Sequence, residues 1–222
     1  MGATIKPPAP RIALIHALAH SVAPINEELQ RAWPEAVRMN LLDDSLSADL
    51  ARSGAGLDAA MHDRFEALTA YAAGTGAQAI LFTCSAFGPC IEAAAARRPH
   101  MPVLKPNEAM VADAVALGGR VGLIASFAPT LSSMPPEFPR GTELVTRLAE
   151  GALEALNEGD VQTHDAKVVE AARWLADQGC DVIALAQFSM ARAQMAVHRA
   201  VDLPVLTTPG SAVRMLRLRL AA

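Results

Sequence analysis

Three side chains that could do chemistry follow a short apolar run in the first half of the sequence. The run AILF stops, and Thr83, Cys84 and Ser85 come directly after it. A thiolate can accept a proton, and hydroxyl groups can donate hydrogen bonds to an anion such as a carboxylate. A helix is expected to begin just beyond, and the backbone N–H groups at its start would lower the pKa of the Cys84 thiol. We therefore expect Cys84 to be catalytic; the alternative is an inert buried cysteine.

The segments around these residues recur roughly a hundred residues later in the chain. Four pairs of segments match in the same order: 11–25 with 120–134, 62–76 with 164–179, 77–88 with 180–191, and 101–111 with 203–213. Any two α/β segments share some features, but an ordered recurrence indicates that one unit is present twice.

Short apolar runs alternate with helix-like stretches in both halves. Runs such as RIALI, AILF, RVGLI and DVIALA are apolar at successive positions, which is typical of parallel strands covered on both faces. We predict an α/β fold with two similar Rossmann-like subdomains that carry parallel sheets and are related by a pseudo-twofold axis. The first subdomain covers residues 10–115 and the second 116–211, and a C-terminal helix over 212–222 packs back on the first.

The functional site is expected between the two halves. Ligands of open parallel sheets bind beyond the carboxyl ends of the strands, and in a duplicated fold these ends face each other. Gln187 takes the place in the second half that Cys84 takes in the first, so the thiol should face a carboxamide. The candidate substrate-binding residues come from both halves: Thr83, Ser85, Ser126, Phe127, Thr130, Gln187, Phe188 and Ser189.

The duplicated chain, with a cysteine after the second apolar run of one half, resembles the aspartate/glutamate/hydantoin racemase superfamily. This group includes arylmalonate decarboxylase and maleate isomerase. The motifs that carry the resemblance are LFTCSAFGP, the loop IASF and the segment DVIALAQFSM. The resemblance implies a cofactor-independent enzyme of two α/β subdomains. Its substrate carboxylate would lie at their interface, held by backbone amides and hydroxyl groups.

The racemases that the chain resembles place two cysteines on opposite faces of the substrate α-carbon. Cys84 matches the first of them, but Gln187 stands at the second position. A carboxamide does not exchange a proton near neutral pH, so two-thiol racemisation is not expected. The decarboxylase branch, by resemblance, keeps one thiol in the second half, and this chain has the reverse arrangement.

Histidines near the predicted site are candidates for a second proton-transfer group. His16 and His20 follow the first apolar run, and an imidazole can transfer protons near neutral pH. We take His16 as the second catalytic candidate; the alternative is a loop histidine that faces solvent or caps a helix. The sequence has no set of residues with metal-ligand spacing and no phosphate-loop or dinucleotide motif, so no metal or cofactor is expected.

The composition argues against several classes of partner. The net charge of −4 over 222 residues does not suit a nucleic-acid-binding protein. No apolar run is long enough to cross a bilayer, and the N-terminus lacks the apolar core of a signal peptide. We therefore expect a soluble cytoplasmic protein with three free cysteines, whose partner is a small carboxylate. The alanine-rich stretch IEAAAARR is compatible with a homodimer.

Three functional hypotheses follow. The favoured one is an isomerase of the racemase superfamily that forms a carbanion or enediolate next to a small carboxylate, with Cys84 as its single catalytic cysteine. The reaction could instead be an arylmalonate-type decarboxylation, or a racemisation in which His16, His20 or a water replaces the missing cysteine. The third hypothesis is a small-carboxylate-binding protein without activity.

Overall fold

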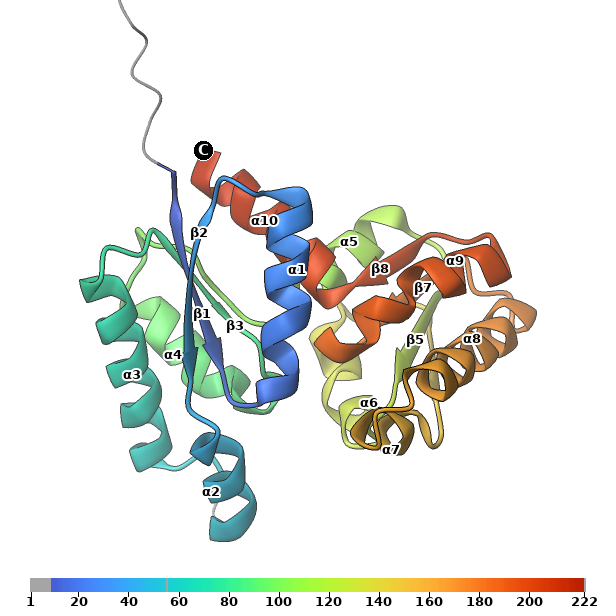
Figure 1. The fold of residues 1–222 in the computed structure, drawn as a ribbon, viewed down its shortest axis with the longest axis horizontal. Helices are drawn as coiled ribbons and strands as arrows, with labels where there is room; N and C mark the ends of the chain where they lie inside the picture. The colour runs from blue at the N-terminus through green and yellow to red at the C-terminus, as the bar shows by residue number, and fades with distance from the viewer. Residues whose placement is uncertain (1–8, 55, 222) are drawn as a thin grey trace, which may run out of the picture.

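The computed structural model describes residues 9–54 and 56–221, and it contains two four-stranded parallel sheets. Residues 1–8, on which the expected lack of a signal peptide rests, lie outside the described residues, as do 55 and 222. The strand order is β2-β1-β3-β4 in the first sheet and β6-β5-β7-β8 in the second (Figure 1). The strands are β1 (Arg11–His16), β2 (Val37–Leu42), β3 (Ala79–Phe82), β4 (Val103–Leu104), β5 (Val121–Ala125), β6 (Leu144–Leu148), β7 (Val182–Leu185) and β8 (Val205–Thr207).

The two sheets repeat the same topology, and the predicted duplicated α/β fold is confirmed. Each pairs its first strand with the second and third, in parallel throughout. The inner strands β3 and β7 are buried at every residue, which explains their unbroken apolar sequences. The edge strands β2 and β6 were not predicted. They are half-exposed and read VRMNLL and LVTRL, and such mixed runs give a weak strand signal.

Helices flank both sheets and follow strands in chain order. The helices are α1 (Val22–Ala32), α2 (Ser45–Ser53), α3 (Ala59–Gly74), α4 (Gly88–Ala96), α5 (Glu108–Leu117), α6 (Thr130–Ser133), α7 (Ala152–Asn157), α8 (Val161–Asp177), α9 (Gln194–Val201) and α10 (Thr208–Ala221). Short 3-10 turns precede or extend several of them: η1 (Ala19–Ser21), η2 (Ser85–Phe87), η3 (Pro135–Glu137) and η4 (Phe188–Ala193).

The two longest helices begin and end by the same local chemistry. The side chains of Asp58 and Asp160 accept hydrogen bonds from backbone N–H groups in the first turns of α3 and α8. Gly76 and Gly179 lie just beyond the two helix ends with φ of 82° and 75°, a region that favours glycine. These repeated start and stop signals place β3 and β7 at equivalent points of the two halves.

The last helix of each half packs against the sheet of the other half. Residues of α5 share a buried cluster with β5 and β7 of the second sheet. Residues of α10, in turn, share one with β1, β3 and α1 of the first sheet. Figure 1 shows α10 beside α1, and α5 on the side of the second sheet. The predicted helix over 212–222 therefore begins earlier, at Thr208, and covers the first sheet. The subdomain boundary near residue 115 stays a prediction.

Candidate functional site

A cavity of about 550 Å³ lies where the carboxyl ends of β3 and β7 face each other, and both halves line it. All but two of the residues predicted for the site are among its lining residues. The exceptions are Ser126 and His16, which stand behind the wall and contact lining residues. The lining residues are Leu18, His20, Ser21, Ser47, Leu50, Ala51, Thr83, Cys84, Ser85, Ala86, Pro106, Asn107, Phe127, Pro129, Thr130, Ser133, Ala186, Gln187, Phe188 and Ser189.

Cys84 is held in an extended conformation immediately before the turn η2 and helix α4. Its φ and ψ are −126° and 122°. Beneath it, the ring of Phe65 lies against those of Phe82 and Phe87, with centroids 5.2 and 4.9 Å away. All three rings are buried, and Phe82 and Phe87 lie on either side of Cys84 in the chain. Their packing on Phe65 fixes the end of β3 and the following turn. The thiol is thus presented to the cavity from a rigid base.

The expectation of a lowered thiol pKa is wrong. Burial raises the pKa of Cys84 above its ordinary value, and this outweighs the backbone N–H of Ala86 and the hydroxyl of Ser47, which both favour the thiolate. A backbone N–H near the start of the helix does lower the thiol pKa, as predicted. Its effect is smaller than that of burial, which shields the sulfur from water and raises the pKa. Cys84 is therefore a neutral thiol, able to donate a proton, at neutral pH.

Gln187 occupies the matching position in the second half. It is extended, with φ of −132° and ψ of 146°, directly before the turn η4, as Cys84 is before η2. Its Oε1 accepts hydrogen bonds from the backbone N–H of Ser126 at 2.6 Å and from the Ser126 hydroxyl at 3.0 Å. These two donors fix the carboxamide orientation, so the amino group is the end left to bind a ligand. Within the described residues, Gln187 Nε2 has no hydrogen-bond acceptor.

His16 lies behind Thr83, fully buried, with both ring nitrogens bonded. Its Nε2 is 3.0 Å from Oδ1 of Asn40, an oxygen that can only accept, so Nε2 carries the proton. Its Nδ1 is 2.9 Å from the Thr83 hydroxyl and 3.2 Å from that of Ser21. Burial, partly offset by the bond to Asn40, lowers the pKa of His16, so the ring is neutral.

This network decides where the Thr83 proton points. The Ser21 hydroxyl donates to the carbonyl oxygen of Leu18 at 2.8 Å, so the Thr83 hydroxyl donates either to Nδ1 of His16, at 2.9 Å, or to the Ser21 oxygen, at 2.8 Å. The Thr83 hydroxyl therefore presents lone pairs to the cavity while His16 is neutral. A carboxylate could accept a hydrogen bond from Thr83 only after this proton turns away from His16 and Ser21.

The cavity wall is mostly apolar and carries no fixed charge. Among the lining residues that the structure describes, none is Asp, Glu, Lys or Arg, and His20 and Cys84 are the titratable ones. Leu18 and Phe127 are about half exposed, as expected for side chains at the mouth of a cavity. Phe188 is buried and belongs to the apolar cluster of the first sheet. The site therefore offers neutral donors beside an apolar surface.

Several lining residues were missed by sequence reasoning. Ser47, Leu50 and Ala51 come from α2, a helix that was not predicted. The sequence did hold a signal, because Leu46 and Leu50 recur at helical spacing after two aspartates. Asn107 was also missed; it is buried, and its amide lies 3.4 Å from the carboxylate of Glu137.

Residues 17–216 match the family described as Asp/Glu/hydantoin racemase. The chain belongs to this family. The match spans both halves and the whole cavity, and it confirms the predicted resemblance. The protein is accordingly an enzyme of the racemase-like type. No curated protein matches the chain significantly.

Solved structures of this superfamily share the fold. An allantoin racemase from Klebsiella pneumoniae is 19% identical, with a TM-score of 0.69 over 96% of this chain and 88% of the other. A glutamate racemase from Thermus thermophilus is 21% identical, with a TM-score of 0.67 over 97% and 82%. A variant of arylmalonate decarboxylase is 19% identical, with a TM-score of 0.68 over 96% and 94%. At these identities the likeness is one of fold.

Two further findings concern partners and ligands. None of the helices in residues 9–54 and 56–221 is long and apolar enough to cross a bilayer. Across the same residues, no group of three or more His, Cys, Asp or Glu side chains is arranged to hold a metal ion.

Proposed function

We propose that this family member forms an enediolate or carbanion next to a small carboxylate, without a cofactor, and that Cys84 is its single proton-transfer residue. The observation that carries the proposal is the pairing across one cavity of Cys84 with Gln187, each directly after the inner strand of its half. One thiol can transfer a proton to or from one face of the substrate α-carbon. The opposite face meets the carboxamide of Gln187, which does not release or accept a proton near neutral pH.

The site has the donors that an enediolate requires. The backbone N–H of Ala86 already points at the Cys84 sulfur, and Gln187 offers an amino group fixed by Ser126. Such neutral donors stabilise an oxyanion strongly in a cavity with few waters. Ser85, Thr130 and Ser189 add hydroxyl groups in the same wall. In this arrangement His16 is a positioning residue, because it acts on the cavity through the Thr83 hydroxyl.

Among reactions of this type, decarboxylation of a substituted malonate fits best. The bond between the α-carbon and one carboxylate breaks, CO₂ leaves, and the electron pair stays on the carbon as an enediolate. The Cys84 thiol then donates its proton to that carbon, and water returns a proton to the thiolate. A neutral thiol suits this step, and its pKa is raised by burial. The apolar wall favours loss of a charged group as neutral CO₂.

Racemisation is the second candidate, and it needs an acid and a base on opposite faces of the α-carbon. Besides Cys84, the lining residue whose side chain can both donate and accept a proton is His20. It is exposed, in the turn η1. A racemase mechanism therefore assigns the second proton transfer to His20 or to a water.

The substrate substituent is expected to be apolar and uncharged. No described lining residue offers a carboxylate to an ammonium group or a guanidinium to a distal acid. Leu18, Leu50, Phe127 and Phe188 instead offer surface to an aryl or branched alkyl group. We therefore expect 2-aryl and 2-alkyl malonates or monocarboxylates to bind, and free aspartate and glutamate to bind weakly.

The test uses the intact protein with a panel of 2-substituted malonates and chiral 2-substituted acids in deuterated water. Decarboxylation is read as CO₂ release with one deuterium at the α-carbon, and racemisation as deuterium entry with loss of optical purity. The Cys84→Ala variant should abolish either reaction. Turnover that survives this substitution would refute the role of Cys84.

A binding protein without activity gives a different pattern. In that case the acids would protect Cys84 from iodoacetamide, yet none would exchange its α-proton or lose CO₂. Protection without exchange across the whole panel would therefore replace the catalytic proposal by the binding one.

A further inference from the structure

Helix α2 carries two functional faces on opposite sides of a short helix. Ser47, Leu50 and Ala51 are three and four residues apart and line the cavity. Ser45 and Asp49, four residues apart, point the other way, toward α3. The position of α2 against α3 therefore sets where the cavity face lies.

The cavity face of α2 reaches the thiol directly. The Ser47 hydroxyl donates a hydrogen bond at 3.2 Å to the carbonyl oxygen of Ala17, just after β1, and Ser47 is also one of the groups that lower the pKa of Cys84. Leu50 belongs to the apolar layer that packs on the first core. Any displacement of α2 would thus remove a polar contact from the thiol and a wall from the cavity.

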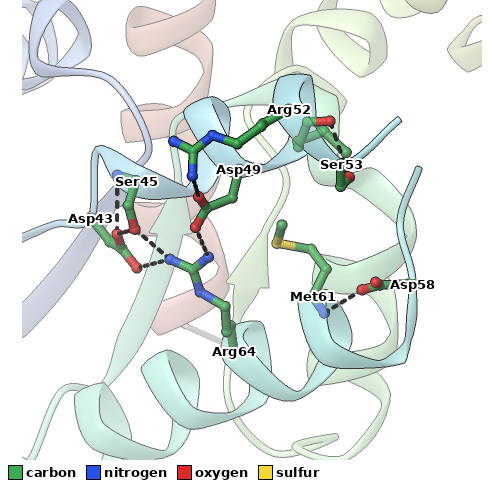
Figure 2. A network of polar contacts seen from close by, with 9 residues as sticks. Asp43, Ser45, Asp49, Arg52, Ser53, Asp58, Met61 and Arg64 are labelled. Carbon is green, nitrogen blue, oxygen red and sulfur yellow. Dashed lines mark hydrogen bonds and ion pairs between the residues drawn. The ribbon is translucent and has the colours of Figure 1, made fainter. Parts of the chain in front are cut away.

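One side chain of α3 holds the opposite face of α2. Figure 2 shows the Arg64 guanidinium between Asp43 and Ser45, at the start of α2, and Asp49, in the middle of the helix. It donates to Asp43 at 2.7 Å, to Ser45 at 2.6 Å and to Asp49 at 2.8 Å. The planar guanidinium has five donors spread over a rigid fork, so it reaches these separated acceptors together, whereas the compact ammonium of a lysine would not span them in the same geometry.

Besides Arg64, α2 is held by Leu46 and Leu50, which pack on the first core, and by the Ser47 hydroxyl, which donates to the carbonyl oxygen of Ala17. The first residue of α2 follows Asp44, whose side chain makes no capping hydrogen bond, and its last residue precedes Gly54, which has a φ of 61°. Leu46 is the buried apolar side chain of the helix. Helix α3, which carries Arg64, has a well-defined start by contrast, because the side chain of Asp58 accepts a hydrogen bond from the backbone N–H of Met61 in its first turn (Figure 2).

We propose that Arg64 is a positioning residue for the active site, and that it acts through α2 by holding Ser47 and Leu50 in the cavity wall that they share with Cys84. Arg64 itself is not a lining residue and its donors face acidic partners, so it binds no substrate. The inference rests on the proposed function in taking Cys84 as the reactive group.

The test compares Arg64→Met with a matched variant of the same helix, Glu66→Gln. Glu66 also forms ion pairs from α3, with Arg97 and Arg98 at the end of α4, at similar exposure and away from α2. Backbone hydrogen–deuterium exchange over residues 45–53 reports the hold on α2. The rate of iodoacetamide labelling of Cys84, followed to its high-pH plateau, reports access to the thiol.

In Arg64→Met we expect exchange over residues 45–53 and plateau labelling of Cys84 to rise about tenfold, as for a locally opened element. In Glu66→Gln both should stay near the original values. Arg64→Lys should recover part of the loss, because an ammonium keeps the charge but lacks the planar fork that reaches separated acceptors together. Unchanged exchange and labelling in Arg64→Met, or equal changes in Arg64→Met and Glu66→Gln, would overturn the proposal.

These readouts need no turnover, so they separate this proposal from the proposed function. A protein that decarboxylates nothing can still show the Arg64 effect. If the protein is active but hydrogen–deuterium exchange over residues 45–53 does not change in Arg64→Met, the proposed function stands and the proposed role of Arg64 is wrong.

Discussion

At the scale of single residues, the reactivity of Cys84 depends on a balance between burial and two donors. Burial raises the thiol pKa, whereas the Ser47 hydroxyl and the Ala86 N–H lower it. A bound carboxylate would compete for the same donors. The protonation state of Cys84 is thus sensitive to small changes in its surroundings.

Replacing Ser47 by Ala should raise the Cys84 pKa further, because the thiolate loses a hydrogen-bond donor. The midpoint of the pH profile for iodoacetamide labelling would then move to higher pH. Ser133→Ala is the matched control: Ser133 lines the same cavity but bonds the carbonyl oxygen of Thr130. A downward shift in Ser47→Ala, or an equal upward shift in both, would contradict this account of the thiol.

His16 should make the folded protein sensitive to acid. Its pKa in the folded state lies below the ordinary 6.5, mainly because of burial. Below 6.5 the unfolded chain therefore binds a proton that the folded chain does not, so stability is complete above that pH and falls as pH drops toward the folded-state pKa. His16→Asn should remove this part of the decline, seen as a smaller loss of Tm between about pH 7.5 and pH 5.5. An equal loss in both proteins would refute it.

At the scale of elements, the exchanged helices carry much of the packing. Leu216 of α10 is fully buried in the cluster that includes Ile12 and Leu14 of β1, whereas Leu218, on the same helix, is 72% exposed. We expect Leu216→Ala to lower the free energy of unfolding by about 2–5 kcal/mol. Leu218→Ala should change it by less than about 0.5 kcal/mol. Urea denaturation of both variants measures the difference, and similar values would mean that α10 does not form part of the first core.

The elements that sequence patterns predicted are those whose surroundings are uniform. β3 and β7 are buried on both faces, so continuous apolar runs reveal them, and the internal repeat is enough to align Cys84 with Gln187. By contrast, contacts from one side only hold the edge strands β2 and β6 and helix α2. Their sequences therefore mix polar and apolar residues, and this pattern did not predict a strand or a helix. Ser47 was therefore missed, and the effect of burial on the Cys84 pKa could not be foreseen from local sequence.

At the scale of the whole molecule, the duplication brings two equivalent strand ends to one cavity and gives them different chemistry. Because Gln187 takes the place that corresponds to Cys84, a Gln187→Cys variant would present a thiol from each half. The variant should gain racemisation of a chiral 2-substituted acid, detected as deuterium entry with loss of optical purity. Gln187→Ser, which cannot act as a base near neutral pH, is its control. Absence of exchange in the cysteine variant would show that the two positions do not face one α-carbon.

The exchange of α5 and α10 also bears on how the chain is made. During synthesis, β1 and β3 emerge early, but the apolar face that α10 covers has no cover until residues 212–216 have left the ribosome. The first core can therefore close only after the second half and residues 212–216 of α10 have been translated. Nascent chains of this enzyme should accordingly bind holding chaperones until residues 212–216 have emerged, rather than fold one half at a time.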